Sequence, residues 1–142
     1  MPPPGRIALD RLPFSDPNAL DVHLKAAGAR STDFGPAFSH LAATNTENAK
    51  RFVSSFAKVM DTNEQLRSMF DYVARASDAE RELAIDGLRD GGQGTRLVHA
   101  VGQLPAAQGR KLMRSFVLDE SGRIREKQIE NVAIWLAEAG RV

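Results

Sequence analysis

Apolar residues recur at helical spacing through most of the chain, and the longest such pattern covers residues 121–140. In that stretch Ile129 and Leu136 fall on one helical face, whereas Ile134 and Trp135 lie off it. A helix that is apolar on more than one side is either central to a core or meets a partner with its second face. We therefore expect Ile134 and Trp135 to be covered by the N-terminal helices or to bind a partner.

Shorter amphipathic patterns with narrower apolar faces precede this stretch. They are Ala49–Met60, Leu66–Ala74, Ala79–Leu88, Leu97–Leu104 and Leu112–Val117. No segment shows the sustained alternation of a β-strand, and the connections are short enough for consecutive helices to pack as antiparallel neighbours. The pattern predicts an all-α fold with about seven or eight amphipathic helices joined by short capped turns. The helices would form either a compact bundle or a short α-superhelix.

Helix-start signals lie between these patterns. The segments Thr44–Glu47, Thr62–Gln65 and Ser77–Glu80 each match the capping box, in which a side-chain hydroxyl accepts a hydrogen bond from the third helical amide. Pro105 indicates another start, because proline is favoured at the first helical position. These signals predict a six-helix body over residues 44–140.

The first 46 residues have a different character, since they hold six of the seven prolines. Proline fixes φ and removes an amide donor, so long helices are not expected here. We predict an extended, proline-rich arm over residues 1–15 and two short helices within residues 16–43. Asp16 and Pro17 begin the first of these helices, and the second runs from about Pro36 to Ala43. Residues 16–142 would then form a single all-helical domain.

Length and composition restrict the class of protein. The 142 residues carry a net charge of +1 and no cysteine, which excludes disulfides and thiolate metal sites. The N-terminus lacks the apolar stretch of a secretory signal peptide, so we expect a cytoplasmic location, in the producing cell or in a target cell if the protein is translocated. No apolar run approaches about 20 residues, so no membrane partner is expected. The excess of arginine over lysine and the abundant alanine favour a GC-rich bacterial genome.

Gly91-Gly92-Gln93 resembles the tripeptide with which peptide-chain release factors reach the peptidyl-transferase centre. In those proteins the tripeptide lies on a mobile, strongly basic loop, whereas here it follows Asp90 and precedes a helical pattern. We interpret it as the end of the preceding helix, where glycine accepts a left-handed φ.

The segment LMRSFVLDESGRIREKQIENV, residues 112–132, resembles an EF-hand in its frame. Gly122 stands at the turn position of the loop and Ile124 at its buried apolar position. Calcium needs six to eight oxygen ligands, but Val117 and Gln128 stand where the two central carboxylates belong. We therefore expect no calcium binding and interpret the segment as a helix–loop–helix joint, with Asp119 or Ser121 capping the last helix and Gly122 in its first turn.

No motif nominates a catalytic, cofactor-binding or metal-binding residue. His23, His40 and His99 are isolated in the sequence and show no ligand spacing. An enzyme whose site is assembled only in space, around His99 and Arg96, is one alternative function.

Basic residues gather late in the chain, at Arg110, Lys111, Arg114, Arg123, Arg125 and Lys127, with three acidic residues among them. A small nucleic-acid-binding protein that uses the segment Arg110–Lys127 is the second alternative, although so small an excess of charge makes nucleic acid an unlikely partner. Our main prediction is a non-enzymatic protein–protein interaction module of bacterial origin: an adaptor, a secretion chaperone or a translocated effector. It would bind another protein or a second copy of itself, without a cofactor. The candidate partner-binding residues are Ile134, Trp135, Arg110, Arg114 and Arg123.

Overall fold

The structure is a computed structural model that describes residues 9–60, 62–118, 121–125, 128 and 133. These residues form one 3-10 helix, η1, and seven α-helices. In chain order the elements are η1 (Leu9–Arg11), α1 (Pro17–Ala26), α2 (Ser31–Thr44), α3 (Thr46–Val59), α4 (Asn63–Arg75), α5 (Asp78–Asp90), α6 (Gly94–Val101) and α7 (Ala106–Val117). The described residues contain no strand, only one isolated bridge, so the all-α prediction is confirmed.

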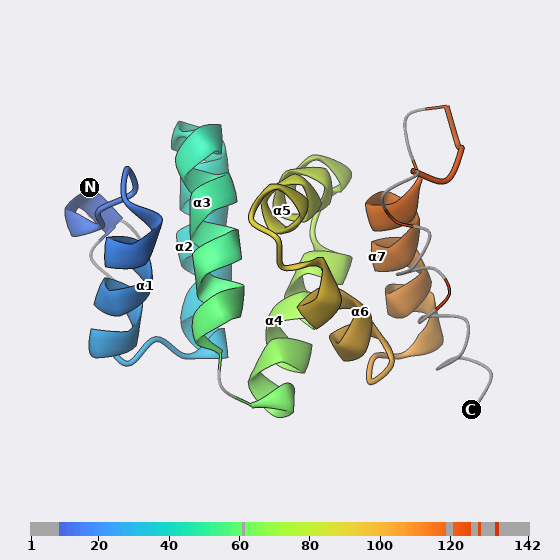
Figure 1. Cartoon of the computed structure of the whole chain (residues 1–142), viewed down its shortest axis with the longest axis horizontal. Coiled ribbons are helices and arrows are strands. Elements are labelled where there is room, and N and C mark those ends of the chain that lie inside the picture. The colour runs from blue at the N-terminus through green and yellow to red at the C-terminus, as the bar shows by residue number, and fades with distance from the viewer. Residues whose placement is uncertain (1–8, 61, 119–120, 126–127, 129–132, 134–142) are drawn as a thin grey trace.

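The helices form consecutive hairpins that stack along the long axis of the molecule (Figure 1). Within the hairpins α2 packs on α3, α4 on α5 and α6 on α7. Between hairpins α2 contacts α4 and α4 contacts α6, while α3 contacts α5 and α5 contacts α7. This two-layer order is typical of a short α-superhelix, one of the two predicted architectures. Helix α1 extends the second layer by packing on α3.

Phenylalanines from α2 and α3 form the centre of the first hairpin. Phe34 stacks on Phe38 with ring centroids 5.1 Å apart and lies 5.3 Å from the ring of Phe56. The rings of Phe34 and of Tyr72 on α4 are nearly perpendicular, with centroids 5.8 Å apart. Phe34, Phe38 and Phe56 are fully buried. Through the contact of Phe34 with Tyr72, this cluster joins the first hairpin to the second.

Residues 9–15 differ from the extended arm that the prolines predicted over residues 1–15. Leu9 begins a turn of 3-10 helix, and both Leu9 and Leu12 are buried in the core. Phe14 packs against the same core. Burial of apolar side chains favours a docked segment here. Residues 1–8, which hold three of the prolines, lie outside the described residues.

Three of the predicted helix starts are confirmed by their capping hydrogen bonds. The Asp16 carboxylate accepts from the amides of Asn18 and Ala19, at 3.1 and 3.3 Å. Thr62 and Ser77 accept from the third amide of α4 and α5, at 3.2 and 3.3 Å. Each cap satisfies an amide that has no partner within its helix.

Two predicted boundaries are wrong. Helix α3 is capped by Asn45 rather than Thr44, because α2 continues through Thr44, whose hydroxyl donates to the carbonyl of His40 at 2.9 Å. Helix α2 begins at Ser31 and contains Pro36. Proline there removes one intrahelical hydrogen bond. The burial of Phe34, which precedes it, favours the longer helix.

The Gly-rich segment after α5 ends that helix as predicted. Gly92 has a φ of 74°, and the amide of Gln93 donates to the carbonyl of Leu88 at 2.8 Å. This is the geometry of a left-handed helix C-terminus. The Gln93 side chain is 8% exposed and donates to the carbonyl of Gly91 at 3.1 Å, so it does not project from the surface.

A tight turn follows α7. Leu118 forms an antiparallel bridge with Ile124, the amide of Arg125 donates to the carbonyl of Val117 at 2.7 Å, and Gly122 has a φ of 84°. The prediction that Gly122 lies in the first turn of the last helix is therefore wrong, because Gly122 turns the chain back onto the end of α7. Most of the helix predicted over residues 121–140 lies outside the described residues; Ala133 is helical.

Candidate functional site

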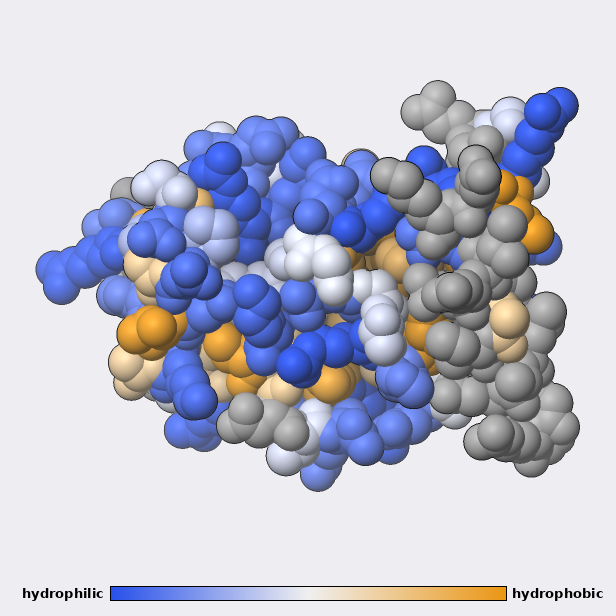
Figure 2. Space-filling view, viewed as in Figure 1, coloured by the Kyte–Doolittle hydropathy of each residue, from blue (hydrophilic) through white to orange (hydrophobic). Residues whose placement is uncertain are grey.

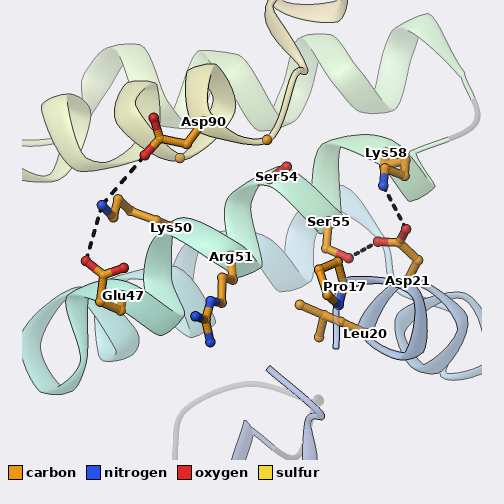
Figure 3. A pocket seen from close by; sticks show the side chains of 12 residues that line it. Pro17, Leu20, Asp21, Glu47, Lys50, Arg51, Ser54, Ser55, Lys58 and Asp90 are labelled. Atoms are coloured by element: carbon orange, nitrogen blue, oxygen red, sulfur yellow. Dashed lines mark hydrogen bonds and ion pairs between the residues drawn. The ribbon is translucent and has the colours of Figure 1, made fainter. Parts of the chain in front are cut away.

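A groove of about 370 Å³ lies over α3, between α1 and α5 (Figure 3). Its residues come from those three helices and from Gly91, which follows α5. They are Pro17, Leu20, Asp21, Glu47, Lys50, Arg51, Ser54, Ser55, Lys58, Gly87, Asp90 and Gly91. Helix α3 forms the floor, since half of these residues belong to it.

Close packing of α5 on α3 sets one wall of the groove. A β-carbon added at Gly87 would lie 2.6 Å from the carbonyl oxygen of Lys50 and 2.8 Å from its α-carbon. Real β-carbons do not approach backbone this closely, so only glycine permits this distance between the helices. A β-carbon added at Gly91 would meet the side chain of Ser54 rather than the backbone of α3.

Lys50 links the floor to that wall. Its ammonium lies 3.2 Å from a Glu47 oxygen and 3.7 Å from an Asp90 oxygen (Figure 3). The hydrogen bond with Glu47 raises the pKa of Lys50 above 10.5, and the negative charges of Glu47 and Asp90 act in the same direction against partial desolvation. Lys50 therefore stays charged at neutral pH, and this end of the groove carries one more negative than positive charge.

Asp21 forms the corresponding link between α1 and the floor. One carboxylate oxygen lies 3.0 Å from the ammonium of Lys58, and the other accepts a hydrogen bond from the hydroxyl of Ser55. Ser55 is only 4% exposed. A nucleophilic serine needs access to substrate and a base for its proton. Because Ser55 is buried and the Lys58 ammonium is already paired with Asp21, the three residues form a helix-to-helix contact.

Arg51 is the groove cation whose charge is least compensated. Its side chain projects from α3 (Figure 3). The guanidinium donates to the carbonyl of Phe14 at 3.3 Å. Among the described residues no carboxylate lies within ion-pair distance of it. Pro17 provides an exposed apolar surface from α1, and the lining residue Leu20 is buried in the core. The groove therefore presents a positive charge beside apolar atoms.

The partner-binding residues predicted from the sequence lie elsewhere. Arg110 and Arg114 are exposed on α7, one turn apart, and Arg123 is exposed in the turn that follows. Ile134 and Trp135 lie outside the described residues. The structure brings Arg110 and Arg114 onto one helical surface, and it does not bring either into the groove.

The three histidines are spread over the fold, whereas Arg96 and His99, the two residues of the alternative enzyme hypothesis, lie three positions apart on α6. His23, His40 and His99 belong to α1, α2 and α6. Arg96 donates to the carbonyl of Ala57 near the C-terminal end of α3, at 3.5 Å. Within the described part of the chain no three histidine or acidic side chains are grouped so that they could hold a metal ion.

None of the helices in the described residues is both long enough and apolar enough to cross a membrane. The face of the molecule in Figure 2 is mostly hydrophilic, with hydrophobic atoms in small separate areas. Comparisons with protein-family profiles, curated proteins and solved structures find no match for this chain. The proposals below therefore rest on the chain's own geometry.

Sequence reasoning missed the groove. One local signal for it was available: Gly87 interrupts an otherwise ordinary helical pattern, and an isolated helical glycine often marks a close backbone approach. Gly87 approaches α3, however, and helix α4 lies between α3 and α5 in the sequence. The local pattern therefore does not show which helix Gly87 contacts.

Proposed function

We propose that this protein is a non-enzymatic protein-binding module that holds a segment of a partner protein in the groove over α3. The observation that supports this proposal best is the groove itself, a hollow in which paired charges, one uncompensated arginine and apolar atoms come together. Hollows that combine an apolar surface with a few placed polar groups are typical binding sites.

The dimensions of the groove suit a short stretch of polypeptide. Its floor runs along α3 from Glu47 to Lys58. The eleven helical steps from Glu47 to Lys58 correspond to about 16 Å at 1.5 Å per residue. An extended peptide rises about 3.3 Å per residue, so about five residues would cover this length.

Arg51 would anchor such a peptide. Its guanidinium can form two parallel hydrogen bonds with a carboxylate, and this geometry is stronger and more specific than a contact with a neutral carbonyl. Exchange of the Phe14 carbonyl for a partner's carboxylate would strengthen the bonding of Arg51. Pro17 would contact an apolar side chain next to that carboxylate.

The other charged side chains of the groove serve to fix its walls. Lys50 holds α5 and Asp21 holds α1 onto the floor. They form ion pairs between helices, whereas general acid–base catalysis requires a group positioned to exchange a proton with substrate. This use of the charges supports binding over chemistry. The predicted settings of a bacterial adaptor, secretion chaperone or translocated effector are each consistent with a module of this kind.

A random-peptide display selection on the purified full-length chain tests the proposal. Enriched peptides, fluorescently labelled, are titrated with the wild type, with Arg51→Ala and with Lys25→Ala, which removes an exposed lysine of α1 outside the groove. We expect Arg51→Ala to weaken binding about tenfold, which corresponds to about 1.4 kcal/mol. The Lys25→Ala control should bind like the wild type.

Two results would contradict the proposal. One is a selection that enriches no peptide above the background of an unrelated protein. The other is a set of enriched peptides whose affinity is the same for the wild type and for Arg51→Ala.

A further inference from the structure

The positive charge of the chain is concentrated in its α6–α7 hairpin. The 28 residues from Gly91 to Leu118 contain four lysines and arginines and no aspartate or glutamate. The whole chain has a net charge of +1, so the remaining residues together carry a net negative charge of three. A region of positive charge attracts binding partners that carry negative charge.

Three of these four cations lie together on α7. Arg110, Lys111 and Arg114 are all exposed, and none of them forms an ion pair with any residue that the structure describes. We call these three residues the α7 basic face. Elsewhere in the described part of the chain, four helical cations pair with a carboxylate three or four positions away: Lys50, Arg75, Arg81 and Arg89. Helix α7 contains no carboxylate that could form such a pair.

The spacing of the α7 basic face defines the group it can bind. Arg110 and Arg114 are one helical turn apart, with β-carbons about 6 Å from each other, and Lys111 is a helical neighbour of Arg114, three positions before it. Carboxylates three or four positions apart on a helix have the same separation. Alternate residues of an extended strand, about 6.6 Å apart, come close to it.

We propose that the α7 basic face binds an acidic segment of a partner protein, in which aspartates or glutamates recur at one of these spacings. This inference rests on the proposed function in that the partner is a protein, and it adds a second binding surface whose chemistry is defined. The groove lies on α1, α3 and α5, so the two surfaces share no residue.

The size of the surface favours an acidic protein over nucleic acid. Three cations would neutralise about three phosphates, whereas nucleic-acid-binding proteins commonly contact six to ten. A short acidic peptide segment can bind within the span of the three cations.

Fluorescence anisotropy on the full-length chain tests the inference. The probes are a labelled peptide with glutamates at every fourth position, a labelled single-stranded oligonucleotide and a labelled duplex, each at 50 and 200 mM salt. One variant replaces all three residues of the α7 basic face by alanine. Its matched control carries Arg11→Ala, Lys25→Ala and Arg67→Ala, which remove the same charge from exposed positions on η1, α1 and α4.

We expect the glutamate peptide to bind the wild type and the control variant alike, and to bind the α7 variant at least tenfold more weakly. The oligonucleotides should bind more weakly than the peptide at both salt concentrations. Thermal unfolding of each variant checks whether the fold is retained. We expect it to be retained, because all the replaced side chains are exposed.

Three results would overturn the inference: no binding of the glutamate peptide at 50 mM salt, an equal loss of binding in the control variant, or tighter binding of either oligonucleotide. The Arg51→Ala variant separates this inference from the proposed function. If peptides selected on the wild type still depend on Arg51 while the α7 variant changes nothing, only the α7 inference fails. If the α7 basic face binds the glutamate peptide and no selected peptide depends on Arg51, only the groove proposal fails.

Discussion

Replacing Gly87 by alanine tests the close contact between α3 and α5 that shapes the groove. Alanine is the better helix former, and the exchange alone would stabilise a helix by about 1 kcal/mol. At Gly87, however, the new β-carbon would lie 2.6 and 2.8 Å from backbone atoms of Lys50. Backbone atoms cannot rotate away as a side chain can, so α5 has to move off α3.

The expected loss of stability follows from these two opposing effects. Overpacking of a core costs about 1 to 3 kcal/mol, and a contact with backbone belongs at the upper end of that range. Subtraction of the gain in helix propensity leaves a loss of about 2 kcal/mol in the free energy of unfolding. For a chain of this length, that loss lowers the midpoint of thermal unfolding by about 6 °C.

Gly109→Ala is the matched control, because Gly109 is also a buried helical glycine. Its nearest neighbours, the side chain and carbonyl oxygen of Val101, would lie 3.2 and 3.3 Å from the new β-carbon. That contact is tight but can be relieved by a small shift, so we expect a change within about 1 kcal/mol. Urea and thermal unfolding followed by circular dichroism measure both variants. If Gly87→Ala is as stable as Gly109→Ala, the inferred backbone contact between α3 and α5 is wrong.

Three further predictions concern polar contacts between and within helices. Arg89→Ala removes two hydrogen bonds, at 3.1 and 3.2 Å, to carbonyls near the C-terminal end of α7, and should cost about 2 kcal/mol in urea unfolding. Tyr72→Phe removes the hydroxyl that lies 2.6 Å from the Ser39 hydroxyl, and should cost about 1 kcal/mol in the same assay. Because the hydrogen bond with Glu47 raises the pKa of Lys50, the stability that Lys50 contributes is complete below pH 10.5 and is lost as the pH rises through its pKa in the folded protein. Unfolding of wild type and Lys50→Met at pH 8 and above pH 10.5 should therefore show a loss in the wild type that is smaller in the variant.

Each of these predictions has an outcome that contradicts it. Arg75→Ala breaks an exposed ion pair with Asp71 and should cost less than about 0.5 kcal/mol. An equally small cost for Arg89→Ala would show that its two hydrogen bonds to α7 carbonyls do not stabilise the fold. A Tyr72→Phe variant as stable as the wild type would show that the hydrogen bond between Ser39 and Tyr72 does not contribute to the free energy of unfolding. If the alkaline loss is the same in Lys50→Met as in the wild type, it comes from groups other than Lys50.

Local features of the fold could be predicted from the sequence because the interactions behind them are local. The caps at Asp16, Thr62 and Ser77 each join a side chain to an amide within three residues. The cap at Asn45 was missed because Thr44 has the same capping chemistry, and only the packing of α2 decides which residue ends that helix. Pro36 was misread as a helix start for the same reason, since burial of the aromatic face of α2 outweighs the local preference of proline.

The candidate site could not be predicted in the same way, because the contacts that form it join distant parts of the chain. Asp21 pairs with Lys58, and Lys50 with Asp90, across helices whose relative positions depend on the stacking order of the hairpins. An amphipathic pattern shows which face of a helix is buried, but not which helix covers it. The α7 basic face is the exception: Arg110 and Arg114 fall on one helical face by spacing alone, and the sequence predicted both as partner-binding residues.

The groove and the α7 basic face differ in how far the protein already compensates their charges, and this difference predicts how each responds to salt. In the groove, Asp21 and Lys50 have partners at 3.0 to 3.7 Å, so a ligand that displaces them loses as many charge contacts as it gains. The affinity of the ligand for the groove then depends on shape, on apolar contact and on Arg51. Salt screens these contacts little once they are buried. The α7 basic face has no internal partner among the described residues, so it attracts an acidic segment over a longer range, and salt screens that attraction. Raising the salt from 50 to 200 mM should therefore weaken binding of the glutamate peptide several-fold and leave groove-selected peptides nearly unaffected. A partner that carries both segments would be captured by α7 and retained by the groove.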